Sequence, residues 1–208
     1  MRDGNAGACQ PVVQMIVPLV LALLLTAPAP TPLCQPEPKD SPAREAVWDA
    51  HIAALPTLEQ GLPAQPDPAL LMPIAGVRVS DIVGTWGAAR GGGLKHAGQD
   101  IFARRGTPVL SATIGTVWMI GASVRGGTWV YVLGAGGRRY YYAHLERVAA
   151  GLKEGQKVST STVLGTVGTT GDAEDTPPHL HFALFGRPHQ DGPCRFPAFD
   201  PLPLLRNR

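Results

Sequence analysis

The sequence predicts an all-β domain, a mainly antiparallel sandwich or open barrel, with a short helical segment near the N-terminus. Its 208 residues include 25 Gly and 21 Pro, and only 16% are charged, which suits short strands and tight turns better than helix bundles. From Leu71 onward, short apolar runs alternate with glycine-rich turns, and no helix longer than two turns is evident.

Residues 1–29 are predicted to be a signal peptide or an uncleaved N-terminal anchor. Val12–Leu25 is almost wholly apolar, which is short for a membrane span but right for a signal-peptide core. Ala27–Ala29 fits a small-x-small cleavage pattern, whereas Pro30 directly after it would hinder cleavage. We therefore expect export to the periplasm or cell envelope, either secreted or attached to the membrane through this segment.

Residues 30–70 are predicted to be a linker that contains one amphipathic helix. The stretch up to Pro42 is too rich in proline to pack as a core segment. Ser41 can cap a helix that starts at Pro42. One apolar stripe follows at i, i+4 and i+7: Trp48, Ile52 and Leu55. The predicted helix covers Ala43–Leu55, and Gly61–Pro68 reads as a second linker.

The three cysteines fit no zinc-finger spacing. Cys9 falls in the leader. Cys34 and Cys194 would pair in an oxidising compartment or stay as two thiols, and the sequence leaves both open. Lipidation of Cys34 is disfavoured, because Leu33 before it is not a small residue.

Seven strands are expected within the domain over residues 71–208: Gln99–Phe102, Pro108–Ala112, Gly115–Ile120, Thr128–Leu133, Arg138–Leu145, Val163–Val167 and His179–Phe185. Pro108–Ile120 and Lys157–Val167 share a strand-Gly-Val cadence, which suggests two related hairpins. The same cadence suggests an alternative fold and function, a lipoyl- or biotin-carrier-like domain. That function needs a lysine at an exposed hairpin tip, and Lys95, Lys153 and Lys157 are not so placed.

The first candidate site is the pair His179 and His181. Because residues i and i+2 of a strand point to the same face, these imidazoles lie side by side. Leu180, Phe182 and Leu184 fall on the other face, which reads as core. Two imidazoles on a half-buried strand are costly to bury without partners, so a metal would give them a use. Two surface histidines on an edge strand are the alternative.

His96 and Asp100 are the second candidate. If Gln99–Phe102 is a strand entered from the Gly91–Gly93 loop, Asp100 lies at its start and His96 in the loop before it. Both side chains could then reach one point. Two imidazoles and one carboxylate make a tripod that suits zinc and leaves a fourth position for water. A turn histidine and a turn aspartate are the alternative.

His144, at the end of a tyrosine-rich strand, is the third candidate. Strict alternation puts one set of side chains on one face and a second set on the other: Tyr140, Tyr142 and His144 against Tyr141, Ala143 and Leu145. A lone histidine beside tyrosines is more often structural. A functional role for His144 is therefore favoured only if the other two groups of candidate residues lie beside it in the fold.

In this order and spacing, the three pieces together resemble the lysostaphin/LytM-type zinc metallopeptidases of bacterial cell walls. That family has an H-x3-D motif, a central Tyr-x-His-Leu and a late His-Leu-His-Phe, which match His96–Asp100, Tyr142–Leu145 and His179–Phe182. The resemblance covers roughly Leu71–Leu205. The chain departs from the family pattern between Gly171 and His179. Where the family usually has small residues, this chain has Asp172, Glu174 and Asp175, which leaves substrate preference open.

The resemblance implies an antiparallel β domain of the LytM peptidase type with one Zn²⁺ in a groove. His96, Asp100 and His181 would be its ligands, and His144 and His179 the non-ligand catalytic histidines. The implied activity is zinc-dependent endopeptidase cleavage of peptide cross-links in bacterial peptidoglycan. Either catalytic histidine could take the proton of water or assist the leaving amine, and the sequence does not assign the steps.

A different class is a non-catalytic LytM-like factor that binds cell wall or activates an amidase. Degenerate relatives typically lose ligands, and none is lost here.

The formal net charge of +2 gives no polybasic signature for nucleic acid. The basic excess after Val77 suits an acidic polymer or an ordinary solvated surface. We expect peptidoglycan peptides as partners, no nucleic acid, and a monomer.

Overall fold

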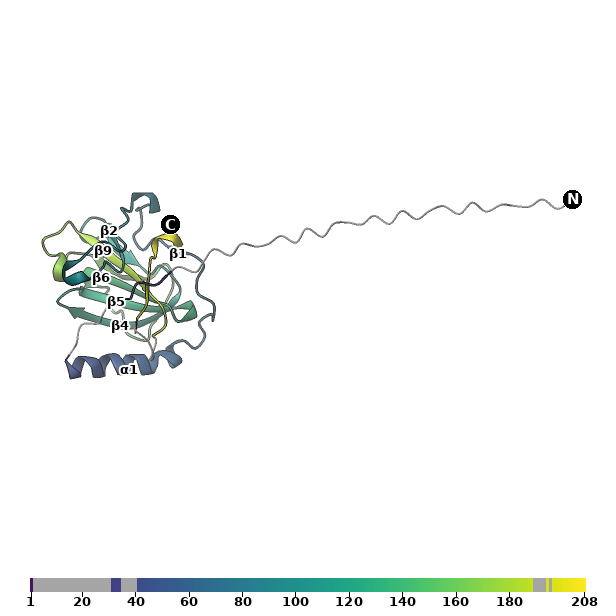
Figure 1. The fold of residues 1–208 in the computed structure, drawn as a ribbon, viewed down its shortest axis with the longest axis horizontal. Helices are drawn as coiled ribbons and strands as arrows, with labels where there is room; N and C mark the ends of the chain where they lie inside the picture. The colour runs from purple at the N-terminus through teal and green to yellow at the C-terminus, as the bar shows by residue number, and fades with distance from the viewer. Residues whose placement is uncertain (2–30, 35–40, 189–193, 195) are drawn as a thin grey trace.

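The computed structural model describes residues 1, 31–34, 41–188, 194 and 196–208 (Figure 1). The predicted leader, apart from Met1, lies outside these residues. The described part holds one α-helix, α1 (Pro42–Leu58). Its strands are β1 (Leu70–Leu71), β2 (Gln99–Phe102), β3 (Pro108–Leu110), β4 (Gly115–Ser123), β5 (Gly127–Gly134), β6 (Arg139–Val148), β7 (Lys157–Val158), β8 (Val163–Val167), β9 (His179–Phe185), β10 (Ala198–Phe199) and β11 (Leu205–Arg206).

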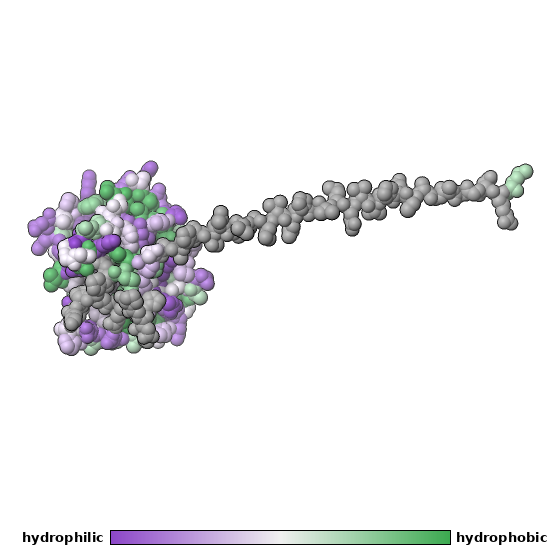
Figure 2. All heavy atoms as spheres, in the orientation of Figure 1, coloured by the Kyte–Doolittle hydropathy of each residue, from purple (hydrophilic) through white to green (hydrophobic). Residues whose placement is uncertain are grey.

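Strands β2 to β10 form one antiparallel sheet, which confirms the predicted all-β class. Its main path runs β10-β9-β6-β5-β4-β7. β2 pairs with β9 beside this path, and β8 pairs with both β3 and β6. β1 and β11 make a separate two-stranded parallel ladder. On the face seen in Figure 2, hydrophilic and hydrophobic residues are interspersed, as on an ordinary solvated surface.

All seven predicted strands occur, and three have the predicted bounds: β2, β8 and β9. β3 stops at Leu110 rather than at Ala112, because the Ala112 N–H donates to the Tyr142 hydroxyl instead of to a strand. β6 continues beyond Leu145 to Val148, because this end also pairs with β8. The expected pair of hairpins is wrong: β3 pairs with β8 and β4 with β7, so the two similar stretches pair with each other.

The main core lies on one face of the sheet. Leu180, Phe182 and Leu184 of β9 are fully buried there, as the alternation predicted. Tyr140 and Tyr142 of β6 lie opposite them across the ladder and are also fully buried. Burial of each such large side chain contributes about 1.5–3 kcal/mol to folding. These tyrosines therefore serve packing, and the opposite face of β6 and β9 is left for the groove.

The predicted face of His144 is wrong because β6 contains a bulge. Thr128 pairs with Leu145 and Val130 with Tyr142, so one residue of β5 stands against two of β6. His144 takes φ 59°, the only positive φ of a non-glycine among the described residues. Leu145 consequently returns to the core, and the His144 side chain turns to the face that carries Tyr141.

Helix α1 packs beside β4, as Figure 1 shows. Its predicted stripe faces a second apolar cluster, built around Trp118, Trp129 and Leu133. The helix extends three residues beyond the predicted end, through Pro56, because Leu58 packs against the same cluster. Ser41 stands at the N-cap position but makes no side-chain cap hydrogen bond.

The predicted linkers contact the sheet. The Thr113 hydroxyl donates to the carboxylate of Asp67 in the Gly61–Pro68 stretch over 2.5 Å. Leu33 bridges Ala198 of β10 through two backbone hydrogen bonds. Cys34 and Cys194 form a disulfide with their Cα atoms 5.2 Å apart, which resolves the alternative that the sequence left open. Among the described residues, no helix is both long and apolar enough to cross a membrane.

Candidate metal centre

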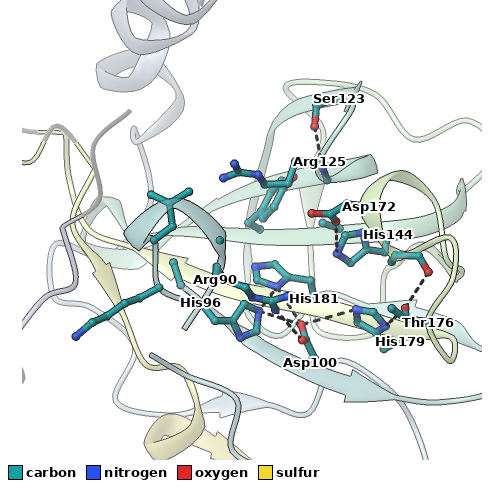
Figure 3. A pocket seen from close by; sticks show the side chains of 18 of the residues that line it. Arg90, His96, Asp100, Ser123, Arg125, His144, Asp172, Thr176, His179 and His181 are labelled. Carbon is teal, nitrogen blue, oxygen red and sulfur yellow. Dashed lines mark hydrogen bonds and ion pairs between the residues drawn. The ribbon is translucent and has the colours of Figure 1, made fainter. Parts of the chain in front are cut away.

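Three of the predicted site residues converge on one point (Figure 3). His96 Nε2 lies 2.8 Å from His181 Nδ1, and each of these nitrogens lies 3.1 Å from Asp100 Oδ1. A tetrahedral zinc ion with bonds of about 2.0–2.1 Å has donor atoms about 3.3–3.4 Å apart. The three donors already stand near that spacing. Two imidazoles and a carboxylate also suit zinc chemically, so the residues fit the ion.

Strand pairing and one loop hold this triad together. Asp100 of β2 is the direct ladder partner of His181 on β9. His96 is fixed by its Nδ1, which lies 2.9 Å from the Thr85 carbonyl oxygen. Because a carbonyl only accepts, Nδ1 must carry the hydrogen, and Nε2 is left with a lone pair toward the other two donors.

Gly98 permits the close packing of the His181 ring. A Cβ at this position would lie 2.6 Å from Cε1 of His181 and 2.8 Å from the Phe182 carbonyl oxygen. Real Cβ contacts do not reach such distances, so a side chain here would displace the ring or the strand. The glycine of the His-x3-Asp stretch is therefore part of the site's construction.

The protonation states favour metal binding. Burial raises the pKa of Asp100, but hydrogen bonds and charges from His181 and His96 outweigh it and hold that pKa well below its usual range. Burial lowers the pKa of His181 to about 4, although Asp100 opposes the shift. At neutral pH the triad thus presents a carboxylate and unprotonated imidazole nitrogen, the forms that bind metals.

His144 and His179 lie beside the triad, with ring centroids 5.0 Å apart. The Nδ1 of His144 contacts the Thr170 carbonyl oxygen at 2.8 Å, and that of His179 contacts the Pro177 carbonyl oxygen at 2.9 Å. Both Nδ1 atoms must donate, so both Nε2 atoms carry a lone pair. The Nε2 of His179 is 3.8 Å from Asp100. Burial lowers the pKa of His144, which keeps its ring neutral.

One cavity of about 730 Å³ contains all five side chains. Several lining residues were not predicted as site residues: Arg90, Lys95, Phe102, Ser123, Arg125, Tyr141 and Thr176. Asp172 of the acidic stretch lines the cavity, whereas Glu174 and Asp175 do not. Burial raises the pKa of Tyr141 well above its usual value, so its phenol stays neutral. Strand alternation combined with the β6–β9 pairing identifies Tyr141, because it shares the face of Ala143, the ladder partner of His181.

Comparison with known proteins gives one family. Residues 94–191 match the sequence model of Peptidase family M23. An L-Ala–D-Glu endopeptidase of Bacillus subtilis is 40% identical over 59% of this chain and 38% of its own length. A peptidoglycan DD-endopeptidase of Vibrio cholerae, ShyA, is 33% identical over 52% of this chain and 25% of its own. The chain thus spans well under half the length of either curated relative.

Among solved structures, one from Pseudomonas aeruginosa that carries the peptidase M23 name superposes with a TM-score of 0.53. It is 25% identical, and the match covers 79% of this chain and 61% of that one. This structural match covers a larger share of the chain than residues 94–191 do.

Proposed function

We propose, since the chain belongs to peptidase family M23 through residues 94–191, that it is a zinc-dependent endopeptidase that cleaves peptide cross-links of bacterial peptidoglycan. The observation that carries the proposal is the meeting of His96, Asp100 and His181 with two further histidines in one cavity. The relatives named for peptidoglycan endopeptidase activity support the substrate class.

In this proposal His96, Asp100 and His181 hold one zinc ion. Bound there, the ion would supply Lewis-acid polarisation of the scissile carbonyl and of a water molecule. The chain itself fixes the ligands: Thr85 orients His96, and the Arg90 guanidinium lies 3.3 Å from the second oxygen of Asp100. Arg90 thus contacts Oδ2 of Asp100, while both histidine nitrogens contact Oδ1.

His144 and His179 are the proposed proton-transfer residues. In its neutral form each ring has its lone pair at Nε2, where it can accept a proton while its Nδ1–H remains bound to a backbone carbonyl. One ring would take the proton of the attacking water. That proton would then pass to the leaving amine, either from the same ring or, after exchange through water, from the other ring. Asp172, whose carboxylate lies 3.9 Å from the Nε2 of His144, would stabilise the charged form of that ring.

We further propose that the chain works outside the cytoplasm, in the periplasm or cell envelope. The Cys34–Cys194 disulfide supports this, because such bonds persist in oxidising compartments. Residues 1–29 would then be the leader or anchor.

The test is cleavage of purified peptidoglycan sacculi by the zinc-loaded full chain, with and without a chelator, and with products identified by mass spectrometry. We expect chelator-sensitive release of uncross-linked muropeptides, restored by added zinc. His181→Ala should lose both zinc and activity. His179→Ala should keep the zinc but lose about 10²- to 10⁴-fold in rate. Absence of cleavage with zinc bound would contradict the proposal, and absence of both would favour the non-catalytic factor.

A further inference from the structure

The cavity is richer in cationic than in anionic side chains. Arg90, Lys95 and Arg125 line it, against two carboxylates, Asp100 and Asp172. A divalent metal held by the triad would add more positive charge. An excess of one sign of charge in a cleft raises the local concentration of ligands of the opposite sign. The cavity therefore favours a substrate that is an anion.

Arg125 stands at a fixed point of the cavity wall. It lies in the turn between β4 and β5, where the Gly126 N–H donates to the Ser123 hydroxyl over 3.0 Å. The Asp172 N–H donates to the Arg125 carbonyl oxygen over 3.1 Å. The backbone beneath the guanidinium is thus held both by its own turn and by the neighbouring loop.

The Arg125 guanidinium itself is available for a ligand. No carboxylate among the described residues pairs with it, and its side chain is exposed. In Figure 3 it extends from the hairpin toward the side of the cavity on which Arg90 and His96 lie. Arg90 differs, because it is already paired with Asp100.

Asp172 adjoins Arg125 through the backbone hydrogen bond from its N–H to the Arg125 carbonyl oxygen, but among the described residues no ion pair joins the two side chains. Asp172 faces His144, with Oδ1 3.9 Å from Nε2. The wall beside His179 is apolar, since Phe102 packs there with its ring centroid 5.3 Å from that of the imidazole. Charge recognition is thus concentrated on the Arg125 side.

We propose that Arg125 is a specificity-determining residue that binds a free carboxylate of the substrate peptide close to the cleaved amide. A guanidinium forms two parallel, charge-assisted hydrogen bonds with a carboxylate. The preferred substrates are then acidic stem peptides, and bridges built of glycine, which carry no side-chain carboxylate, are poor ones. The inference rests on the proposed endopeptidase function.

The test compares two synthetic stem peptides that differ in one group, a free α-carboxylate or an α-carboxamide on the D-Glu residue. The zinc-loaded full chain should cleave the carboxylate peptide with a kcat/KM about 10- to 100-fold higher. Arg125→Gln should reduce that preference to near unity. Arg125→Lys should restore part of it. Arg147→Gln, an exposed arginine of β6 outside the cavity, is the matched control and should keep the full preference.

Equal cleavage of both peptides by the wild-type chain, or equal loss on both in Arg125→Gln, would overturn the inference while the endopeptidase function stands. If neither peptide is cleaved, the proposed function fails. The affinity of the chain for the two peptides then tests the role of Arg125 independently. The zinc-loaded His179→Ala chain should bind the carboxylate peptide about tenfold more tightly than the carboxamide. Equal Kd values would then reject the role of Arg125.

Discussion

Backbone carbonyl groups, not solution pH, choose the tautomers of His144 and His179. Thr170 and Pro177 each accept from an Nδ1–H, so in each neutral ring the lone pair stands at Nε2. Neither carbonyl acceptor could be foreseen from the motifs, because both lie in irregular loops whose path depends on the folded sheet. The histidines themselves were predictable from residue type and order.

Burial of neutral imidazoles makes the metal-free chain sensitive to acid. The pKa values of His144 and His181 are lowered from 6.5, that of His181 to about 4. Below pH 6.5 the unfolded chain therefore binds protons that the folded chain does not, and the free energy of unfolding falls as the pH drops from 6.5 toward 4. Each group contributes up to about 1.4 kcal/mol per pH unit.

Urea unfolding of the chelator-treated chain at pH 7, 6 and 5 measures this loss. The slope against pH should be smaller in His181→Ala, which lacks one of the two groups. A stability that stays constant over this range would show that the rings are not buried in the neutral form.

At the scale of elements, two ladders determine the site. The pairing of Asp100 with His181 follows from the predicted bounds of β2 and β9, which were correct. The bulge of β6 was not predictable from β6 alone, because it depends on how Thr128 and Val130 of β5 pair with it. Strict alternation thus failed at His144, where two strands, rather than one, set the direction of the side chain.

Gly98, at the entry to β2, gives a prediction at this scale. Gly98→Ala should lower zinc affinity at least about tenfold and destabilise the chain by about 1–3 kcal/mol, because the new Cβ would overlap the His181 ring and the Phe182 backbone. Gly84→Ala is the control, since a Cβ there meets nothing within 4 Å and the φ of Gly84 is not positive. Zinc titration and thermal unfolding of both variants measure the effects. Equal behaviour of the two variants would contradict the packing role of Gly98.

For the whole molecule, the long covalent loop is the largest constraint. Cys34 and Cys194 are separated by 160 residues, so their disulfide restricts most of the unfolded chain. Cys34→Ser should lower the free energy of unfolding by about 4–5 kcal/mol on loop-entropy grounds. Cys9→Ser, in the predicted leader, should leave stability unchanged. Chemical denaturation with and without reductant compares them, and a wild-type stability indifferent to reductant would contradict this role.

The same disulfide also limits how far the domain can lie from a membrane anchor. If the apolar segment that ends at Leu25 remains in a membrane, the seven residues 26–32 connect it to Leu33, which is hydrogen-bonded to Ala198. These seven residues reach at most about 25 Å when fully stretched. Reduction of the disulfide, with loss of the Leu33–Ala198 bridge, would release the chain as far as α1. The maximum length of the tether would then roughly double. An anchored enzyme would therefore reach only the layer of cell wall nearest the membrane. The depth of that layer would depend on whether the Cys34–Cys194 disulfide is oxidised or reduced.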